Sequence, residues 1–292
     1  MITPVDVILA LVAALLFALG NTLQQKAGLD EPTDGATSGL LVRMAQRPVW
    51  LAGIAADGLG FVAQAAALGL GRLVVVQPLL VTSVVFAMPL GARFTGQRIT
   101  RTDIGAGVLV VGALVAFLTI ANPSGGRDDA PLGEWLIAAA ACGVPCAILI
   151  LLARRGSPPR RSALLGISAG ILFAVSAALT KAVVDELDDG ILQVFANWQV
   201  YALALVGYVS MTINQMALNA GALAPAVATS TAFDPITSVV LGITLFQESL
   251  HETALGAAVT LIALAAALAG MTILARAQSQ PVSKPLSATA TA

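Results

Sequence analysis

Two carboxylates stand out because they fall inside long apolar stretches of the sequence. Asp57 lies about two helical turns into the stretch 49–70, and Asp234 lies near the centre of the stretch 222–246. An ionised Asp at the centre of a membrane-spanning helix costs about 2.5–3.5 kcal/mol on insertion scales. Such a residue therefore needs either a partner or a function.

Polar residues beside these carboxylates extend the candidate site. Gln64 follows Asp57 by seven residues and Ser230 precedes Asp234 by four, so each lies on the helix face of its carboxylate. Pro235 has no N–H and should kink or unwind the helix next to Asp234, which leaves backbone carbonyls free. Free carbonyls beside a carboxylate favour a site for a cation or a polar solute.

Amide side chains form two further groups, toward the ends of the first and seventh apolar stretches. They are Asn21, Gln24 and Gln25 in the first stretch, and Asn214, Gln215 and Asn219 in the seventh. The two groups come from opposite halves of the chain, so they could converge with the carboxylates on one substrate-binding cavity. If the substrate is a metal cation, Asp57 and Asp234 are its candidate ligands. Alternatively, the amides only bond neighbouring helices or water, and each Asp forms a structural pair with a buried donor.

The elements that carry these residues are predicted to be membrane-spanning helices. The mean hydropathy is +0.89. Apolar residues make up 58% of the 292 residues and charged residues 11%, against about 25% charged in a soluble domain. A soluble fold could not bury so much apolar surface. With about 20 residues per helix, the chain predicts an all-α polytopic membrane protein with spans at 5–25, 49–70, 73–92, 103–121, 132–152, 162–184, 198–218, 222–246 and 253–275.

Two segments outside the spans have their own predictions. Segment 36–47 is too short and too charged to cross a membrane, and it reads as an interfacial helix. The tail 276–292 is rich in Ser, Thr, Pro and Ala and should be a disordered cytoplasmic segment.

The loop charges predict the orientation in the plasma (cytoplasmic) membrane. Of the 15 Lys and Arg residues, all but Arg72, Arg127 and Lys181 fall on one side of the nine spans. Under the positive-inside rule this side is cytoplasmic, so the N-terminus should lie outside and the C-terminus inside.

Weak internal similarity predicts two related halves. A constant offset of 151 residues pairs Gln64 with Gln215, Gly91 with Gly242, Thr102 with Thr253 and Gly105 with Gly256. The predicted domains are a first repeat at 1–121, a connecting span with its loops at 122–161, and a second repeat at 162–275. Because a single span separates the repeats, the second copy is inverted, which is typical of secondary transporters. A duplicated channel or a membrane scaffold is the alternative.

Enzymatic chemistry is not expected. The only histidine is His251, and no catalytic triad, phosphate-binding loop or metal-binding cysteine spacing occurs. Cys142 and Cys146 read as small packing residues. Lys26 and Lys181 are expected to reach toward the membrane surface, although Lys181 could instead neutralise a membrane carboxylate. We expect no cofactor and no nucleic acid, and the bilayer with a small solute or divalent cation as partners. A homodimer is left open.

Several short motifs carry a resemblance to a known family. They are Gly20-Asn21-Thr22-Leu23-Gln24-Gln25-Lys26, Gln46-Arg47-Pro48-Val49-Trp50-Leu51-Ala52-Gly53, Thr180-Lys181-Ala182 and Leu245-Phe246-Gln247-Glu248-Ser249-Leu250. With these motifs the chain resembles the EamA-like drug/metabolite transporter (DMT) superfamily, and within it the NIPA-like magnesium transporter branch. The loop at 245–250 is similar to a glutamate-containing signature of the superfamily. Its first-half counterpart, Gly96-Gln97-Arg98-Ile99, lacks the glutamate.

The resemblance implies two inverted halves and a secondary transporter that works by alternating access, with Mg²⁺ as the leading substrate. Within the same superfamily, the alternative is an exporter of amino acids, metabolites or drugs. The alternative from another class is a non-transporting membrane scaffold or regulatory subunit, which would not need a polar cavity.

Overall fold

The structure is a computed structural model, and it describes residues 4–29, 46–121, 124–127 and 129–249, together with 258, 262–263, 265–270 and 273. The predicted interfacial helix at 36–47, apart from its last two residues, and the predicted tail lie outside these described residues. So does most of the predicted ninth span at 253–275, of which only the positions just named are described, all of them helical.

Long helices dominate the described chain. They are α1 (Pro4–Leu29), α3 (Pro48–Leu70), α4 (Leu73–Leu80), α5 (Thr82–Phe94), α6 (Arg101–Ala121), α7 (Leu132–Ala153), α8 (Pro158–Asp185), α9 (Ile191–Ala196), α10 (Trp198–Leu218) and α11 (Leu223–Thr244), with the 3-10 helix η1 (Glu186–Asp189). The two short strands β1 (Ser124–Gly125) and β2 (Glu248–Ser249) pair antiparallel. Proline stands in the first turn of α3 and α8, where its missing N–H has no helical partner to lose.

Eight spans are long and apolar enough to cross a membrane within the described residues, with α4 and α5 together forming the third. They match the first eight predicted spans in order. Their outer faces carry large apolar side chains that water would not tolerate together. Val108 is 68% exposed, Ile137 70% and Leu205 64%. The protein is therefore a helical, multi-pass membrane protein, as the composition predicts.

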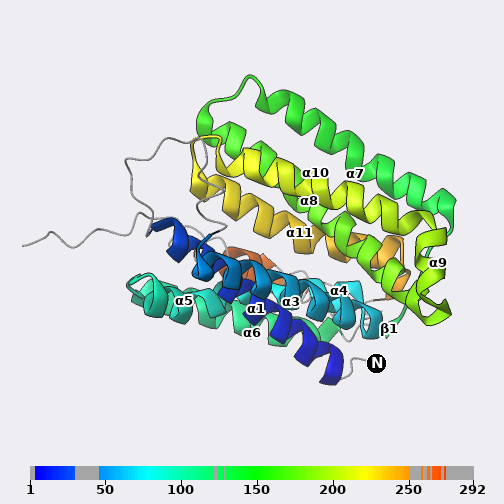
Figure 1. The fold of residues 1–292 in the computed structure, drawn as a ribbon, viewed down its shortest axis with the longest axis horizontal. Coiled ribbons are helices and arrows are strands. Elements are labelled where there is room, and N and C mark those ends of the chain that lie inside the picture. Colours follow the sequence, from blue (N-terminus) through cyan, green and yellow to red (C-terminus); the bar gives the residue numbers. More distant parts are fainter. Residues whose placement is uncertain are drawn as a thin grey trace, which may run out of the picture.

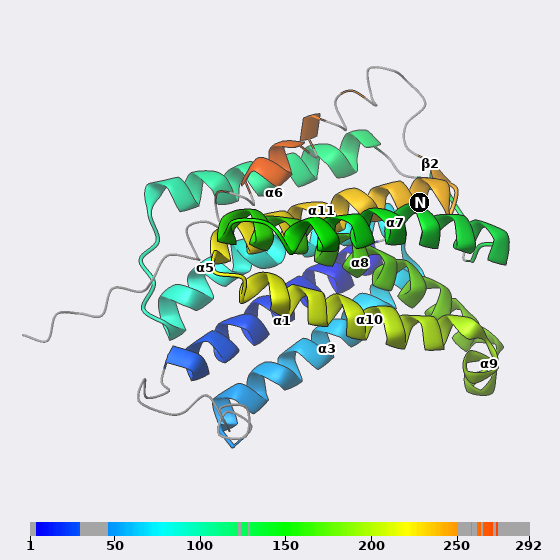
Figure 2. The ribbon, with the colours of Figure 1, turned by 90° about the horizontal axis from the view of Figure 1, so that it is seen from above.

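The helices fall into two groups, one from each part of the chain. Figure 1 shows α1, α3, α5 and α6 on one side and α7, α8, α10 and α11 on the other, with the N-terminus near β1. Figure 2 gives the view from above, in which α3 and α10 lie along the same edge of the molecule. The short helix α4 joins the groups, because it packs on α1 and also on α8 and α11.

The predicted unwinding at Pro235 is wrong. Helix α11 runs without interruption from Leu223 to Thr244 with Pro235 inside it. The adjacent helix α8 packs directly on this turn, where a Cβ added to Gly170 would lie 2.6 Å from the Ser230 carbonyl oxygen and 3.0 Å from the Asp234 nitrogen. This close packing holds the helix although one of its hydrogen bonds is lost to proline.

The break occurs instead in the third span. Helix α4 ends at Leu80 and α5 begins at Thr82, a few residues after Pro78. The N–H of Val81 bonds to the Pro78 oxygen at 3.2 Å and the N–H of Val84 to the Val81 oxygen at 3.1 Å, so the chain tightens locally. The irregular backbone therefore lies between the two helix groups, and not next to Asp234.

Candidate functional site

Asp57 lies where α1 and α3 cross. Its Oδ2 accepts a hydrogen bond from Nε2 of Gln24 on α1. The helices approach closely because glycine occupies both sides of the crossing. A Cβ added to Gly20 would lie 2.0 Å from Asp57 Oδ1, and one added to Gly53 would lie 2.8 Å from Gln24 Cγ. Two of the predicted site residues, Asp57 and Gln24, are thus brought together by small residues.

The second oxygen of the Asp57 carboxylate is in a different situation. Asp57 Oδ1 is buried and has no hydrogen-bond partner among the described residues. A buried oxygen of an ionised carboxylate without any donor is strongly unfavourable. The described residues therefore supply a hydrogen bond to only one of the two carboxylate oxygens of Asp57.

Asp234 has a similarly neutral environment. Its Oδ1 accepts a hydrogen bond of 3.3 Å from the Ser238 hydroxyl, one turn further along α11. Ser230, on the same face, donates to the carbonyl of Val227 at 3.2 Å. Within the described residues neither Asp234 nor Asp57 forms an ion pair.

The remaining predicted polar residues of the first half are scattered. Asn21 is exposed on α1. Gln25 accepts a hydrogen bond of 3.5 Å from Gln97 at the surface. Gln64 is half-buried on α3, about 10 Å along the helix axis from Asp57.

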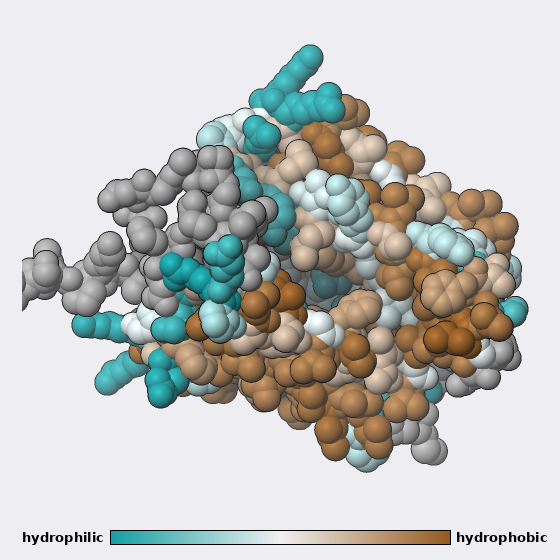
Figure 3. Space-filling model, in the orientation of Figure 1, coloured by the Kyte–Doolittle hydropathy of each residue, from teal (hydrophilic) through white to brown (hydrophobic). Residues whose placement is uncertain are grey.

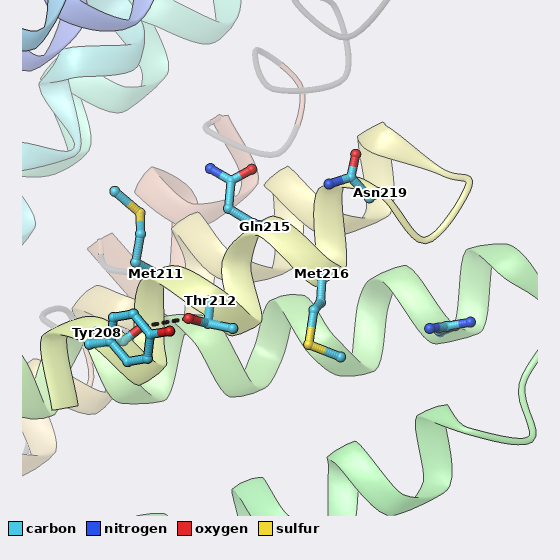
Figure 4. Close-up of a pocket in the computed structure, with 7 residues that line it drawn as sticks. Tyr208, Met211, Thr212, Gln215, Met216 and Asn219 are labelled. Atoms are coloured by element: carbon cyan, nitrogen blue, oxygen red, sulfur yellow. Dashed lines mark hydrogen bonds between the residues drawn. The ribbon is translucent and has the colours of Figure 1, made fainter. Parts of the chain in front are cut away.

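The predicted polar residues of α10 lie mainly along one exposed groove. Gln215 and Asn219 line a groove of ≈ 470 Å³, and the other lining residues are Arg161, Tyr208, Met211, Thr212 and Met216. In Figure 4 Met211, Gln215 and Asn219 point to one side of α10, and Tyr208, Thr212 and Met216 point to the other. Asn214 is half-buried on the same helix. Tyr208 is 74% exposed, so the groove is a surface feature of α10.

Sequence reasoning missed a buried amide in α4. Gln77 is 3% exposed, and its Nε2 has no hydrogen-bond partner among the described residues. The signal was visible, since Gln77 interrupts an apolar run directly before Pro78. Gln77 therefore places a buried amide N–H without a described acceptor on α4, the helix that joins the two groups.

One end of the molecule is closed by apolar packing between the groups. We call it the closed end, and it is the end where β1 and β2 lie. Its buried cluster includes residues of α1, α3, α4, α8 and the end of α11, among them Ala10, Leu68, Leu73, Val76, Ala178, Leu241 and Phe246. At their opposite ends α7, α8, α10 and α11 share another cluster, which includes no residue of α1, α3 or α4. Figure 3 shows the same face as Figure 1 hollowed at its centre, with paler, more polar residues in the hollow than on the brown flanks.

Glu248 fastens this closed end. Its carboxylate accepts hydrogen bonds from the backbone N–H groups of Leu73 (2.9 Å) and Val74 (2.8 Å), the first residues of α4. Glu248 is only 2% exposed. Burial raises the pKa of Glu248 above its ordinary value, while these two N–H groups and the charges of Lys181 and Arg72 act in the opposite direction. The carboxylate thus caps a helix of one group from a strand of the other.

Lys181 also belongs to the closed end, where it is buried against protein, and its reach toward the membrane surface stays a prediction. Its side chain is 6% exposed, and Nζ lies 3.2 Å from the Gly71 oxygen and 5.5 Å from the centre of the Phe246 ring. The charge of Lys181 also acts on Glu248, a carboxylate that lies outside the spans.

Backbone contacts complete this end. Nε of Arg72 donates to the Gly125 oxygen at 2.9 Å, and Nε of Arg127 donates to the Leu245 oxygen at 3.0 Å. The side chain of Asp129 accepts from Trp135 Nε1 and Gln199 Nε2, both at 2.8 Å.

No group of three or more His, Cys, Asp or Glu side chains gathers around a common point in the described part of the chain. The geometry therefore offers no cage for a fully dehydrated metal ion there. Cys146 is buried and donates weakly to the Ser168 oxygen at 3.7 Å, and Cys142 is half-buried, so both described thiols serve packing.

Comparison with known proteins gives one informative relative. No protein-family model matches the chain, and no solved structure gives a significant match. The chain is 34% identical over 248 residues to an uncharacterized protein of Corynebacterium glutamicum, and the match covers 83% of this chain and 84% of that protein. With this identity over most of both chains, the protein belongs to the same family as its Corynebacterium relative.

Proposed function

We propose that this protein is a secondary transporter that carries a small cationic solute across the membrane by alternating access, with Mg²⁺ as the leading candidate. The observation that carries the proposal is the state of its two intramembrane carboxylates. Among the described residues, Asp57 and Asp234 are bonded only by uncharged groups, the Gln24 amide and the Ser238 hydroxyl.

The buried carboxylate at the closed end differs from Asp57 and Asp234 in its neighbours. There the buried carboxylate of Glu248 faces the charges of Lys181 and Arg72 and holds two backbone N–H groups. At the closed end the protein thus places the charges of Lys181 and Arg72 near a buried carboxylate. In the interior it supplies no such charge within the described residues. A negative charge that is costly in the membrane and lacks a protein cation favours a cationic cargo or a proton as its partner.

The small number of carboxylates is compatible with Mg²⁺. This ion keeps several of its waters, and one or two carboxylates hold it while amide and hydroxyl groups bond the waters. The same sparse charge would accept the ammonium group of an organic solute. Mg²⁺ is therefore the first cargo to test, and the predicted resemblance to the NIPA-like branch points the same way.

Alternating access needs two bodies that can part at one end and meet at the other. The apolar cluster and the Glu248 cap close one end, whereas at the other end the buried cluster of α7, α8, α10 and α11 includes no residue of α1, α3 or α4. Element positions favour the predicted repeat: α3 and α10 begin at residues 48 and 198, and α4 and α11 at 73 and 223, an offset of 150 in both cases. Helix α1 packs on α3 as α8 packs on α10. By the loop charges, the closed end would face outside the cell and the opposite end the cytoplasm.

The test is flux into proteoliposomes that contain the purified full chain. Mg²⁺, a set of amino acids and a set of organic cations would be offered separately, with protein-free vesicles as the control. We expect saturable, protein-dependent flux of at least one cation. Flux of a neutral or anionic solute without any cation flux would support the exporter alternative against our proposal. Absence of flux for every solute would favour the scaffold alternative.

A further inference from the structure

We propose that Asp57 is a proton-binding site and that the proton it takes up and releases is the coupling ion of the transporter. This inference rests on the proposed function, which leaves the driving force open. It also separates the two carboxylates, because Asp234 then remains as the one that faces the cargo.

Space is the first argument. Asp57 Oδ1 is buried, and the position that a Cβ on Gly20 would take lies only 2.0 Å from it. The oxygen is closed to solvent, and the α1 backbone at Gly20 lies against one side of it. A Mg²⁺ ion needs about 2.0–2.1 Å to each oxygen and room for its waters as well. A proton is the cation that needs no such room.

Charge is the second argument. Asp57 is the only titratable residue of α3. On α1, Lys26 Nζ lies 3.4 Å from the Phe94 carbonyl, and Asp6 lies at the far end of the helix beside Gly71. Helix α5, which also packs on α1, carries Arg93, and this guanidinium lies over the Phe94 ring. Helix α8 packs on α3 as well, and its Lys181 lies at the closed end against the Gly71 oxygen. Among the described residues no basic group forms an ion pair with Asp57, so a proton is the neutralising partner that the described structure leaves.

The hydrogen bond from Gln24 keeps the carboxyl group in position for both protonation states. The amide N–H donates to Oδ2, which leaves Oδ1 as the oxygen that gains or loses the proton. When Oδ1 is protonated it becomes a donor, and the Gly53 carbonyl oxygen lies in the same helix crossing. The rest of the Asp57 side chain is half-buried. Exchange of the proton therefore requires a rotation of the carboxyl group that carries Oδ1 to the exposed side.

The first test detects the proton itself. Infrared difference spectra of the purified full chain would be recorded over a pH series, following the C=O stretch of protonated carboxylic acids. The comparison uses Asp57→Asn and, as matched control, Asp103→Asn. Asp103 is also buried, but its Oδ2 accepts from both the N–H and the hydroxyl of Thr100 at 2.8 Å. We expect one titrating band that is lost in Asp57→Asn and kept in Asp103→Asn. A band pattern in Asp57→Asn equal to that of the wild type would overturn the assignment.

The second test measures coupling. In proteoliposomes, the wild type should accumulate its cargo when a proton gradient is imposed, whereas Asp57→Asn should lose this response to the gradient. Gln24→Ala, which keeps the carboxyl group, should shift the midpoint of the infrared band, and this guards against a variant that fails to fold. Wild-type cargo flux that ignores the proton gradient would refute the coupling role. A complete lack of cargo flux would instead count against the proposed function, and the infrared result would still decide whether Asp57 binds a proton.

Discussion

The Glu248 cap allows a prediction of stability with a defined size. In Glu248→Ala the N–H groups of Leu73 and Val74 lose their acceptor while remaining buried. An unsatisfied buried donor costs about 1–3 kcal/mol. Two such donors therefore predict a loss of about 2–6 kcal/mol in the free energy of unfolding. Loss of the partner of Lys181 acts in the same direction.

The matched control is another glutamate of the closed end. Glu134 pairs with Arg127, but its side chain is 39% exposed, so solvent screens the pair. Exposed ion pairs contribute about 0–1 kcal/mol, and Glu134→Ala should stay within that range. Glu248→Gln keeps one acceptor oxygen for the N–H groups of α4, so it should be more stable than Glu248→Ala.

The assay is reversible unfolding in mixed detergent micelles, followed by tryptophan fluorescence. Trp135 is a suitable reporter because its ring lies 6.1 Å from Phe246 and 5.6 Å from Trp198 at the closed end. A loss of stability in Glu248→Ala that is no larger than the loss in Glu134→Ala would contradict this prediction. Equal stability would mean that the N–H groups of α4 do not depend on this carboxylate.

Two further predictions use the same assay. Gly170→Ala should lower the free energy of unfolding by about 1–3 kcal/mol because its Cβ would meet the backbone of α11. Gly207→Ala is the control, since Gly207 has open space around it, and its stability should be unchanged or higher by up to about 1 kcal/mol. Equal effects of the two substitutions would contradict the close packing at Gly170. Because burial raises the pKa of Glu248, wild-type stability should fall relative to Glu248→Gln as pH rises from the ordinary glutamate value of about 4.3 through the raised one. A stability difference between the wild type and Glu248→Gln that does not change with pH would show that the pKa of Glu248 is not raised in the folded protein.

The sequence was a good guide to the elements of the fold. Membrane-spanning helices depend on the length of apolar runs, which is a local property, and the first eight predicted spans match the described helices in order. Small residues also recur at four-residue steps at Gly166, Gly170, Ala174 and Ala178, a spacing typical of a packing face, and all four are buried in α8. Local periodicity sets both features.

The effect of a proline on its helix could not be predicted from the local sequence. Pro235 and Pro78 have the same intrinsic effect on a helix, yet α11 continues through Pro235 while the third span breaks shortly after Pro78. Helix α8 packs directly on α11 at Gly170, whereas the third span breaks although α4 packs on α1, α8 and α11. Contacts of this kind join distant segments and leave no local pattern.

The candidate site was predictable by residue type but not by partner. Asp57 was identified as costly in a membrane, but its donor Gln24 lies 33 residues away on another helix. The role of Glu248 was hidden in the same way, because the N–H groups that it caps lie 174 and 175 residues away. Pairings of this range depend on how the two helix groups meet.

We propose that the interior carboxylate of Asp234, which has no ion pair among the described residues, binds the transported cation, and a comparison of fluxes tests this role. Cation flux would be measured side by side for wild type, Asp234→Asn and Asp103→Asn at equal amounts of reconstituted protein. We predict that Asp234→Asn loses most of the flux, because its neutral amide cannot replace the charge, and that Asp103→Asn keeps it. Undiminished flux in Asp234→Asn, with the protein folded and inserted, would contradict the account.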